Sequence, residues 1–428
     1  MLDVSRYTSH CVAETTVRPR VATLKASMIL RIVWQVRDLV ASGHEILNLT
    51  IGDFDPKQYP IPDCIREEVV KAYRDGYTNY PPADGALELR EAIDEMYQRN
   101  FGLRYGPDAI IIGSGARPPL FATFSMFVDE GESSASFLPS WNNSYYAELM
   151  NSNHQYVATT ARSNFHPTVE QVESILPSIQ LLALNSPLNP TGTVIEPSVL
   201  EGIARAVVAE NERRKGTEKR PVMLLFDQVY WMLVAEGYTH KSPVQLCPEV
   251  APYVVHIDAI SKCFAATGLR VGWGVLPPEL QPKMKALIGH TGAWAAHPEQ
   301  IATARFLRQP ELMNSYMDEM RLKVSMRLSL LYQGVLDMKE RGLPVDAIAP
   351  QGALYLSFYV GLIGTRFQTN EEIRSFLLLE AGVAVVPFQA FDMPAENGWF
   401  RMSVGTCSLS ELSQALEQIE RAIQTVAG

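Results

Sequence analysis

The stretch that decides the fold reads Asp258-Ala259-Ile260-Ser261-Lys262-Cys263-Phe264-Ala265-Ala266-Thr267-Gly268-Leu269-Arg270-Val271-Gly272. The apolar run 253–257 leads into this stretch and is typical of a buried strand. Lys262 therefore comes near a strand end among small residues, where loss of solvent lowers the pKa of a lysine and makes its amine nucleophilic. Arg270 follows eight residues later between nearby glycines, and its planar guanidinium suits a phosphate group.

This pair indicates a phosphorylated aldehyde cofactor, pyridoxal phosphate. Such a cofactor needs an amine to bind its aldehyde carbon and a cation to bind its phosphate. The alternative is a surface lysine that follows a strand, as most lysines after a serine do. One stretch does not decide between these interpretations, so the rest of the chain has to supply the other contacts.

Length and composition describe an ordinary globular protein. The chain has 428 residues, enough for two or three domains, and 47% of them are hydrophobic and 20% charged. Its net charge of -10 argues against general nucleic-acid binding, because a phosphate backbone needs a positive surface. A local basic pocket for a small anion is still compatible with this charge.

Targeting and metal signals predict a cytoplasmic protein without a metal site. Residues 1–20 are polar and lack the apolar core of a signal peptide, and no uncharged apolar stretch approaches the roughly 20 residues of a membrane span. The five cysteines are scattered and never in CxxC spacing, which indicates a reducing compartment and no structural zinc. The eight histidines form no HxxxH or HExxH pattern.

Alternation of apolar runs with helical patterns predicts an α/β fold with a mostly parallel sheet. The runs lie at 110–112, 136–138, 156–158, 180–184, 222–226, 253–257 and 271–276. We expect one long helix at 300–341. A second α/β section follows, with strands near 353–359, 383–386 and 399–404 and a closing helix at 410–426.

The N-terminal part is expected to be more irregular. Residues 1–20 are expected to form an arm, part of 21–42 an amphipathic helix, and 46–51 a short strand.

A glycine-rich turn precedes a predicted helix. The run 110–112 is followed by Gly113-Ser114-Gly115-Ala116-Arg117-Pro118-Pro119. Because proline is tolerated in the first turn, a helix is expected to begin near Pro118, and the free N–H groups before it are a ready site for phosphate. A dinucleotide loop is the alternative, but the third glycine is missing and no acidic residue follows a second strand at the expected distance.

Three polar residues could contact the ring of the cofactor. Asn189 lies in a run of turn formers at 185–192 and could present its amide to a ring hydroxyl, although a plain loop is the alternative. Asp227 follows the run 222–226, at the strand end where open α/β sheets bind ligands, and suits a protonated pyridine nitrogen. A helix N-cap is about as compatible with this aspartate. Tyr230 could reach the same ring oxygen as Asn189.

Two further residues are candidates with open alternatives. Trp141, in Pro139-Ser140-Trp141, could stack on a flat ring, but a lone tryptophan is more often part of a core. Arg401 interrupts an apolar strand and therefore needs an anionic partner. That partner is either a substrate carboxylate held by two hydrogen bonds or an internal salt bridge.

The order of these motifs resembles the class I/II aminotransferases, which are pyridoxal-phosphate enzymes of fold type I. The similarity extends over nearly the whole chain and is greatest to the bacterial aspartate aminotransferases called Ib. Its markers are Leu49-Thr50-Ile51-Gly52, residues 80–90, residues 185–192, Asp227-Gln228-Val229-Tyr230, residues 261–272, Gln351-Gly352-Ala353-Leu354-Tyr355 and residues 381–387. The resemblance implies a large domain with a mostly parallel mixed sheet between helices, and a smaller α/β domain.

The resemblance also implies roles for particular positions. Lys262 is implied as the Schiff-base lysine, which later moves a proton between the substrate Cα and the cofactor, and Asp227 as the catalytic partner of the ring nitrogen. The other implied contacts are Asn189 and the catalytic Tyr230 on the ring hydroxyl, Trp141 on the ring face, Gly115, Ala116, Arg117 and Arg270 at the phosphate, and Arg401, Gly52, Asn189 and Trp141 around the substrate.

Domain boundaries and assembly follow from the same resemblance. It implies an arm and part of the small domain at 1–59, a large cofactor-binding domain at 60–302 and the small domain at 303–428. Tyr80 is implied to reach the phosphate of a neighbouring subunit, so a homodimer with shared active sites is expected.

Several positions depart from the family pattern. Ala259 stands where glycine or serine is usual, Gln228 where an acidic residue is common, and Pro118-Pro119 follow Arg117 where Lys-Gln-Ala is common for the three positions. Met28 stands where a hydroxyl usually assists in binding the distal carboxylate of aspartate. Arg117 could bind that carboxylate with a stronger fork, so specificity for acidic substrates is left open.

The function implied is a pyridoxal-phosphate-dependent aminotransferase, which moves an amino group between an L-amino acid and a 2-oxo acid. The oxo acid is expected to be 2-oxoglutarate or oxaloacetate. A β-lyase, a decarboxylase or a synthase on the same scaffold is an alternative, because the cofactor carries the chemistry. A non-catalytic binding protein with this fold is a third hypothesis.

Overall fold

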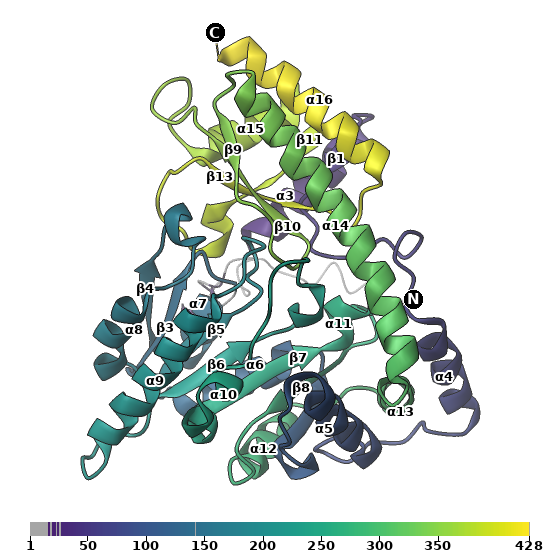
Figure 1. The fold of residues 1–428 in the computed structure, drawn as a ribbon, viewed down its shortest axis with the longest axis vertical. Helices are drawn as coiled ribbons and strands as arrows, with labels where there is room; N and C mark the ends of the chain where they lie inside the picture. Colours follow the sequence, from purple (N-terminus) through teal and green to yellow (C-terminus); the bar gives the residue numbers. More distant parts are fainter. Residues whose placement is uncertain (1–15, 18, 23, 25–26, 142, 428) are drawn as a thin grey trace.

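A seven-stranded sheet forms the larger part of the molecule, in a computed structural model that describes residues 16–17, 19–22, 24, 27–141 and 143–427 (Figure 1). Its strand order is β2 (Ile110–Ser114), β8 (Val271–Val275), β7 (Val254–Ala259), β6 (Met223–Asp227), β5 (Leu181–Asn185), β3 (Ser133–Leu138) and β4 (Asn153–Ala158). All neighbours from β7 to β4 pair in parallel, and β8 runs antiparallel to both β2 and β7. The predicted α/β fold with a mostly parallel mixed sheet is therefore confirmed.

Helices cover both faces of this sheet. Alternate residues of its central strands are buried against one face or the other. In β5, Leu181 and Ala183 pack with the cluster that includes α6 and α12, whereas Leu182 and Leu184 pack with the cluster of α8 and α9. Successive side chains of a strand point to opposite faces, so a strand covered on both sides must be apolar throughout. The continuous apolar runs in the sequence are this signal.

The central strands β5 (Leu181–Asn185), β6 (Met223–Asp227) and β7 (Val254–Ala259) end at the same edge of the sheet. The register pairs Asn185 with Asp227, and Asp227 with Ile257. Ligands of open α/β sheets bind at this carboxyl edge. The chain thus brings polar residues from separate segments into one row.

A smaller part lies above the large sheet in Figure 1. It contains an antiparallel sheet in the order β12-β13-β10-β9 and a parallel pair of β1 with β11. The expected strand at 46–51 is shorter, because only Leu47–Asn48 pair with β11. The expected arm at 1–20 lies largely outside the described residues, and the boundaries after residues 59 and 302 stay a prediction.

The helix α14 (Pro310–Glu340) runs along one side of the molecule from the small part down to the large one (Figure 1). The prediction of one continuous helix at 300–341 was wrong, because α13 (His297–Leu307) ends before α14 begins. Pro310 lacks a backbone N–H and fits only the first turn of a helix, so it starts a new one.

The remaining elements complete the two parts. The helices are α2 (Pro19–Ala22), α3 (Met28–Ala41), α4 (Asp63–Arg74), α5 (Leu87–Phe101), α6 (Arg117–Phe127), α7 (Asn143–Met150), α8 (Val169–Ile175), α9 (Pro197–Arg214), α10 (Pro243–Leu246), α11 (Ile260–Cys263), α12 (Gln281–His290), α15 (Asn370–Glu380) and α16 (Leu409–Val426). The strands are β2 (Ile110–Ser114), β3 (Ser133–Leu138), β4 (Asn153–Ala158), β8 (Val271–Val275), β9 (Val345–Ala347), β10 (Tyr355–Val360), β11 (Val383–Ala384), β12 (Val386–Pro387) and β13 (Trp399–Ser403). Among the residues described, no helix has the length and apolar character needed to cross a membrane.

Replacing Leu331 by alanine tests how far α14 supports the core. Leu331 is 0% exposed, whereas Leu312 on the same helix is 50% exposed. Leu331→Ala should lower the free energy of unfolding by about 2–5 kcal/mol because it leaves a cavity, while Leu312→Ala should change it by less than about 0.5 kcal/mol. Urea unfolding followed by circular dichroism measures both; equal midpoints for the two variants would contradict this packing.

Candidate active site

Lys262 lies on α11 (Ile260–Cys263), directly after the end of β7. Its Nζ donates a hydrogen bond to the carbonyl oxygen of Gly52 over 2.5 Å. The pKa of this amine falls from its ordinary 10.5 to about 8, mainly because of burial; Asp53 opposes this shift and nearby arginines add to it. A lysine in this state supplies a neutral, nucleophilic amine close to physiological pH.

The segment that carries Gly52 is held close to the lysine. Thr267 donates its hydroxyl to Asp53 Oδ1 over 2.7 Å, which ties this segment to the loop between α11 and β8. A Cβ placed on Gly52 would lie 2.5 Å from the hydroxyl oxygen of Tyr355. Only glycine therefore lets the backbone pass between Lys262 and Tyr355.

Asp227 is buried at the end of β6. Burial raises the pKa of its carboxyl group to about 7, and the hydrogen bond of 3.2 Å that Val229 N–H donates to Oδ1 opposes the rise. The Asn185 amide donates to the Asp227 carbonyl oxygen over 2.9 Å, and the Asn189 N–H donates to Asn185 Oδ1 over 2.9 Å. The turn at 185–192 is thus fixed to the neighbouring strand.

Asn189 and Tyr230 have separate partners in this structure. The Asn189 Oδ1 accepts a hydrogen bond of 2.9 Å from Arg401 Nη1. The Tyr230 hydroxyl lies 2.7 Å from the hydroxyl of Tyr355. Whether both also reach one ring oxygen stays a prediction.

Arg401 is a buried cation, only 1% exposed, in strand β13. Besides Asn189, its guanidinium donates to the carbonyl oxygen of Thr50 over 2.5 Å, and its Cζ lies 4.6 Å from the ring centre of Tyr355 and 4.9 Å from that of Phe391. Among the described residues the Nε has no hydrogen-bond partner. The internal salt bridge considered from the sequence is not found among these residues, so the charge faces neutral groups only.

The glycine-rich turn packs against Arg270. Gly115 has a φ of +80°, and a Cβ there would lie 2.3 Å from Arg270 Nη2. Arg270 donates to the carbonyl oxygens of Thr267 over 2.7 Å and Ser114 over 3.2 Å, and its side chain is exposed. The helix α6 begins at Arg117, with Ala116 as its N-cap, close to the predicted start. Turn, helix end and guanidinium together form a candidate anion site.

Trp141 and Tyr80 lie farther out. The Arg117 guanidinium carbon lies 5.8 Å from the ring centre of Trp141, whose ring also packs at 6.0 Å from Phe391. Tyr80 is 83% exposed and contacts Trp294, with ring centres 5.4 Å apart. Its predicted contact with a neighbouring subunit stays a prediction.

The sequence interpretation missed Asp258, which is fully buried beside the site. It accepts hydrogen bonds from Ala259 N–H over 2.7 Å, Trp231 Nε1 over 2.8 Å and the Tyr97 hydroxyl over 3.1 Å. Burial raises its pKa to about 8, and the three donors oppose this. The family commonly has an acid at position 228, but here Gln228 donates its amide to the Tyr97 hydroxyl over 3.1 Å. The Tyr97 hydroxyl in turn donates to Asp258, so an amide at position 228 suits a network that already contains a carboxyl group.

Tyr355 was also missed as a site residue, although the motif at 351–355 was noted. Its hydroxyl is 125 positions from that of Tyr230, and no local pattern pairs them. The available signal was Gly192, at the end of the turn at 185–192, because a Cβ there would lie 2.1 Å from the Tyr355 carbonyl oxygen.

The large mixed sheet, the lysine at its carboxyl edge and the smaller α/β part above it define a transferase of fold type I. The comparisons with known proteins agree. The profile of the family described as aminotransferase class I and II matches residues 44–419. An aspartate aminotransferase of a Bacillus species is 29% identical over 410 residues, which cover 95% of this chain and 98% of the relative.

Two further relatives support the assignment. The aspartate/prephenate aminotransferase of Thermus thermophilus is 31% identical over 94% of this chain and 98% of its own. The crystal structure of the aspartate aminotransferase from Rhizobium meliloti superposes with a TM-score of 0.86 at 27% identity, covering 96% of this chain and 99% of that one. The chain belongs to the class I and II aminotransferase family. It is an enzyme that moves an amino group between an amino acid and a 2-oxo acid.

The low pKa of Lys262 predicts an unusual pH dependence of its reactivity. In cofactor-free protein, the amine should undergo reductive methylation with a midpoint near pH 8, because it is half neutral there. Lys215 is the control: the carboxylate of Glu212 raises the pKa of its amine, so its labelling should require a higher pH. Peptide mass spectrometry measures both, and a Lys262 midpoint above pH 10 would contradict the burial argument.

Proposed function

We propose that this chain binds pyridoxal phosphate through Lys262 and transaminates acidic amino acids such as aspartate. One observation carries the proposal. An amine with a pKa of about 8 lies close to a buried arginine that has no anionic partner among the described residues. This arrangement suits a reaction between an amine and a carboxylate-bearing substrate.

The residues present fit the cofactor. The Asp227 carboxyl group is buried, and its described hydrogen-bond donor reaches only Oδ1, so the other oxygen suits a ring N–H. Gly115 leaves the space beside Arg270 that a side chain would fill, which suits a phosphate at the turn with Ala116 and Arg117. When bound, the cofactor supplies an aldehyde for covalent attachment and a ring that accepts electrons from the substrate Cα.

The remaining residues would surround the cofactor. Asp227 would keep the ring nitrogen protonated. Because burial raises the pKa of its carboxyl group, this group would share a proton with the ring nitrogen in a hydrogen bond. Trp141 would lie on the face of the ring. Asn189 and Tyr230 would bind the ring hydroxyl, with Tyr355 holding the Tyr230 hydroxyl in place.

The substrate would be bound by its α-carboxylate. Arg401 would bind this carboxylate, since its charge is buried and its present partners are neutral oxygens. The Gly52 carbonyl, which accepts the Lys262 hydrogen bond, would contact the substrate and orient the lysine. Lys262, released from the cofactor, would move the proton at the substrate Cα.

An acidic side chain on the substrate would bind Arg117. This guanidinium lies over the Trp141 ring, and Arg117 lines a largely apolar cavity of about 690 Å³, as Ser27 also does. The matched relatives from Bacillus and Rhizobium are named aspartate aminotransferases, which supports aspartate as the donor. Oxaloacetate or 2-oxoglutarate would be the oxo acid.

We also infer a cytoplasmic homodimer. Support for the dimer comes from the exposed Tyr80 and from exposed apolar side chains on α3, Leu30 and Trp34, beside the apolar cavity. Support for the compartment comes from the four described cysteines, Cys64, Cys247, Cys263 and Cys407, which are all free thiols.

Substitution of Lys262 tests the attachment of the cofactor. Lys262→Ala should remove covalently bound cofactor and turnover with aspartate and 2-oxoglutarate, because no other amine occupies this position. Lys215→Ala is the control, since Lys215 is exposed and pairs with Glu212. Absorbance of the purified protein and a coupled rate assay give the readout, and full activity in Lys262→Ala would disprove the assignment.

Substitution of Arg117 tests the acidic specificity. Arg117→Leu should lower kcat/KM for aspartate at least about tenfold, because a hydrogen-bonded charge is worth about 1.5–3 kcal/mol, while kcat/KM for alanine should change less than about threefold. Arg117→Lys should lower kcat/KM for aspartate less than Arg117→Leu does, because lysine keeps the positive charge although it cannot form two parallel hydrogen bonds to the carboxylate. Equal losses for aspartate and alanine would show that Arg117 does not bind the distal carboxylate.

A further inference from the structure

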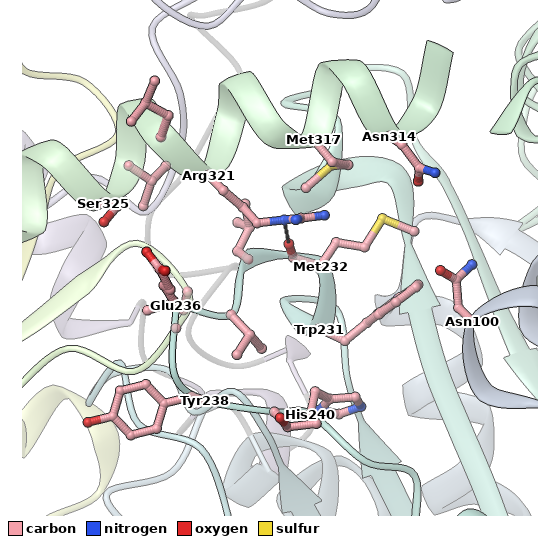
Figure 2. A pocket seen from close by; sticks show the side chains of 18 of the residues that line it. Asn100, Trp231, Met232, Glu236, Tyr238, His240, Asn314, Met317, Arg321 and Ser325 are labelled. Atoms are coloured by element: carbon pink, nitrogen blue, oxygen red, sulfur yellow. Dashed lines mark hydrogen bonds between the residues drawn. The ribbon is translucent and has the colours of Figure 1, made fainter. Parts of the chain in front are cut away.

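A second cavity of about 540 Å³ lies behind the site, between α14 and the segment that follows Tyr230 (Figure 2). This volume is in the range of small-molecule pockets. Its apolar walls come from both sides: Phe101 and Trp231 from the large part, and Met313 and Met317 from α14. The rings of Phe101 and Trp231 lie 4.6 Å apart. The cavity therefore suits a bulky apolar group.

Two opposite charges line the same cavity without pairing with each other. Figure 2 shows the Arg321 guanidinium near the Met232 carbonyl oxygen, to which its Nε donates over 3.0 Å, and Glu236 to one side. Arg321 also forms an ion pair of 3.2 Å with Asp318, and the two side chains are 44% and 74% exposed, so solvent weakens the pair. Glu236 is exposed and forms no ion pair among the described residues.

The other polar residues that line the cavity are neutral, namely Asn100, Tyr238, Thr239, His240, Asn314 and Ser325. Burial lowers the pKa of His240 to about 3, so its ring carries no charge at physiological pH. Its Nδ1 has no hydrogen-bond partner among the described residues, and its Nε2 lies 3.4 Å from Gln228 Oε1. A cavity lined by apolar and neutral polar groups, with one cation and one anion, matches a zwitterion with a large side chain.

We propose that this cavity is an effector site for an α-amino acid with a bulky apolar side chain. Its carboxylate binds Arg321, its ammonium group binds Glu236, and its side chain packs on Trp231 and the α14 methionines. The site is separate from the substrate site at Lys262 and Arg401, because neither of these residues lines it.

The cavity walls are linked to the active site by two routes. Trp231 donates to Asp258 over 2.8 Å, and Asp258 lies four residues before Lys262 on the same strand–helix connection. Val234 forms a β-bridge with Gly352, and Ala353, which also lines the cavity, lies two residues before Tyr355. A bound amino acid would thus touch the supports of Lys262 and Tyr355, and its binding is expected to change turnover.

Equilibrium dialysis of L-phenylalanine with the holoenzyme tests binding without requiring activity. Wild type should bind one more phenylalanine per chain than Arg321→Leu, and Glu236→Gln should weaken binding at this site at least about tenfold. Arg66→Leu is the matched control, because Arg66 is an exposed helix arginine that pairs with Asp63 three residues earlier, as Arg321 does with Asp318. Phenylalanine that binds at the substrate site does so in wild type and in all three variants. It therefore does not contribute to the difference in stoichiometry between them.

Two ligand analogues test the zwitterion. 3-Phenylpropionate lacks the ammonium group and 2-phenylethylamine lacks the carboxylate, so each should bind the cavity at least about tenfold more weakly than phenylalanine. Under saturating substrates, phenylalanine should change kcat at least about twofold in wild type and Arg66→Leu but not in Arg321→Leu. Equal stoichiometry in wild type and Arg321→Leu, or an unchanged wild-type kcat, would overturn the proposal, and neither result would bear on the role of Lys262.

Discussion

The buried charge of Arg401 is the constraint on which the rest of the site depends. A guanidinium that is 1% exposed loses its hydration, and its described partners are the Asn189 side-chain oxygen and the Thr50 carbonyl oxygen. Such a charge is costly unless an anion joins it. The rings of Tyr355 and Phe391 on either side reduce this cost through their negative faces. This buried, unpaired charge is the reason why we propose Arg401 as the receptor for the substrate carboxylate.

The other ionisable groups respond to the same buried environment. Burial moves the pKa of Lys262 down to about 8 and that of Asp227 up to about 7, so each group is displaced toward its neutral form near physiological pH. Substrate amines and cofactor nitrogens exchange protons in this range, which makes both groups suited to proton transfer. The fold produces this by placing both at the ends of β6 and β7, where the sheet meets the smaller part.

The sequence predicted the parts of the site that depend on one segment. Apolar runs located β5, β6 and β7, and parallel pairing then required Asn185, Asp227 and the Lys262 turn to meet at one edge. Contacts between distant segments had no such signal. The Tyr230–Tyr355 pair and the Asp258–Tyr97 hydrogen bond join residues 125 and 161 positions apart. Pro310 indicated the start of a helix. The helical pattern on both sides of it nevertheless favoured one continuous helix, so the break between α13 and α14 was not predicted.

In the proposed reaction, the amino group of aspartate stays on the enzyme after oxaloacetate has left. Mixing the holoenzyme with L-aspartate in the absence of any oxo acid tests this most directly, with oxaloacetate and ammonia measured together. We expect one oxaloacetate per active site, no free ammonia, and a cofactor that retains the amino group until 2-oxoglutarate is added. Continued turnover with release of ammonia, or no oxaloacetate at all, would contradict it.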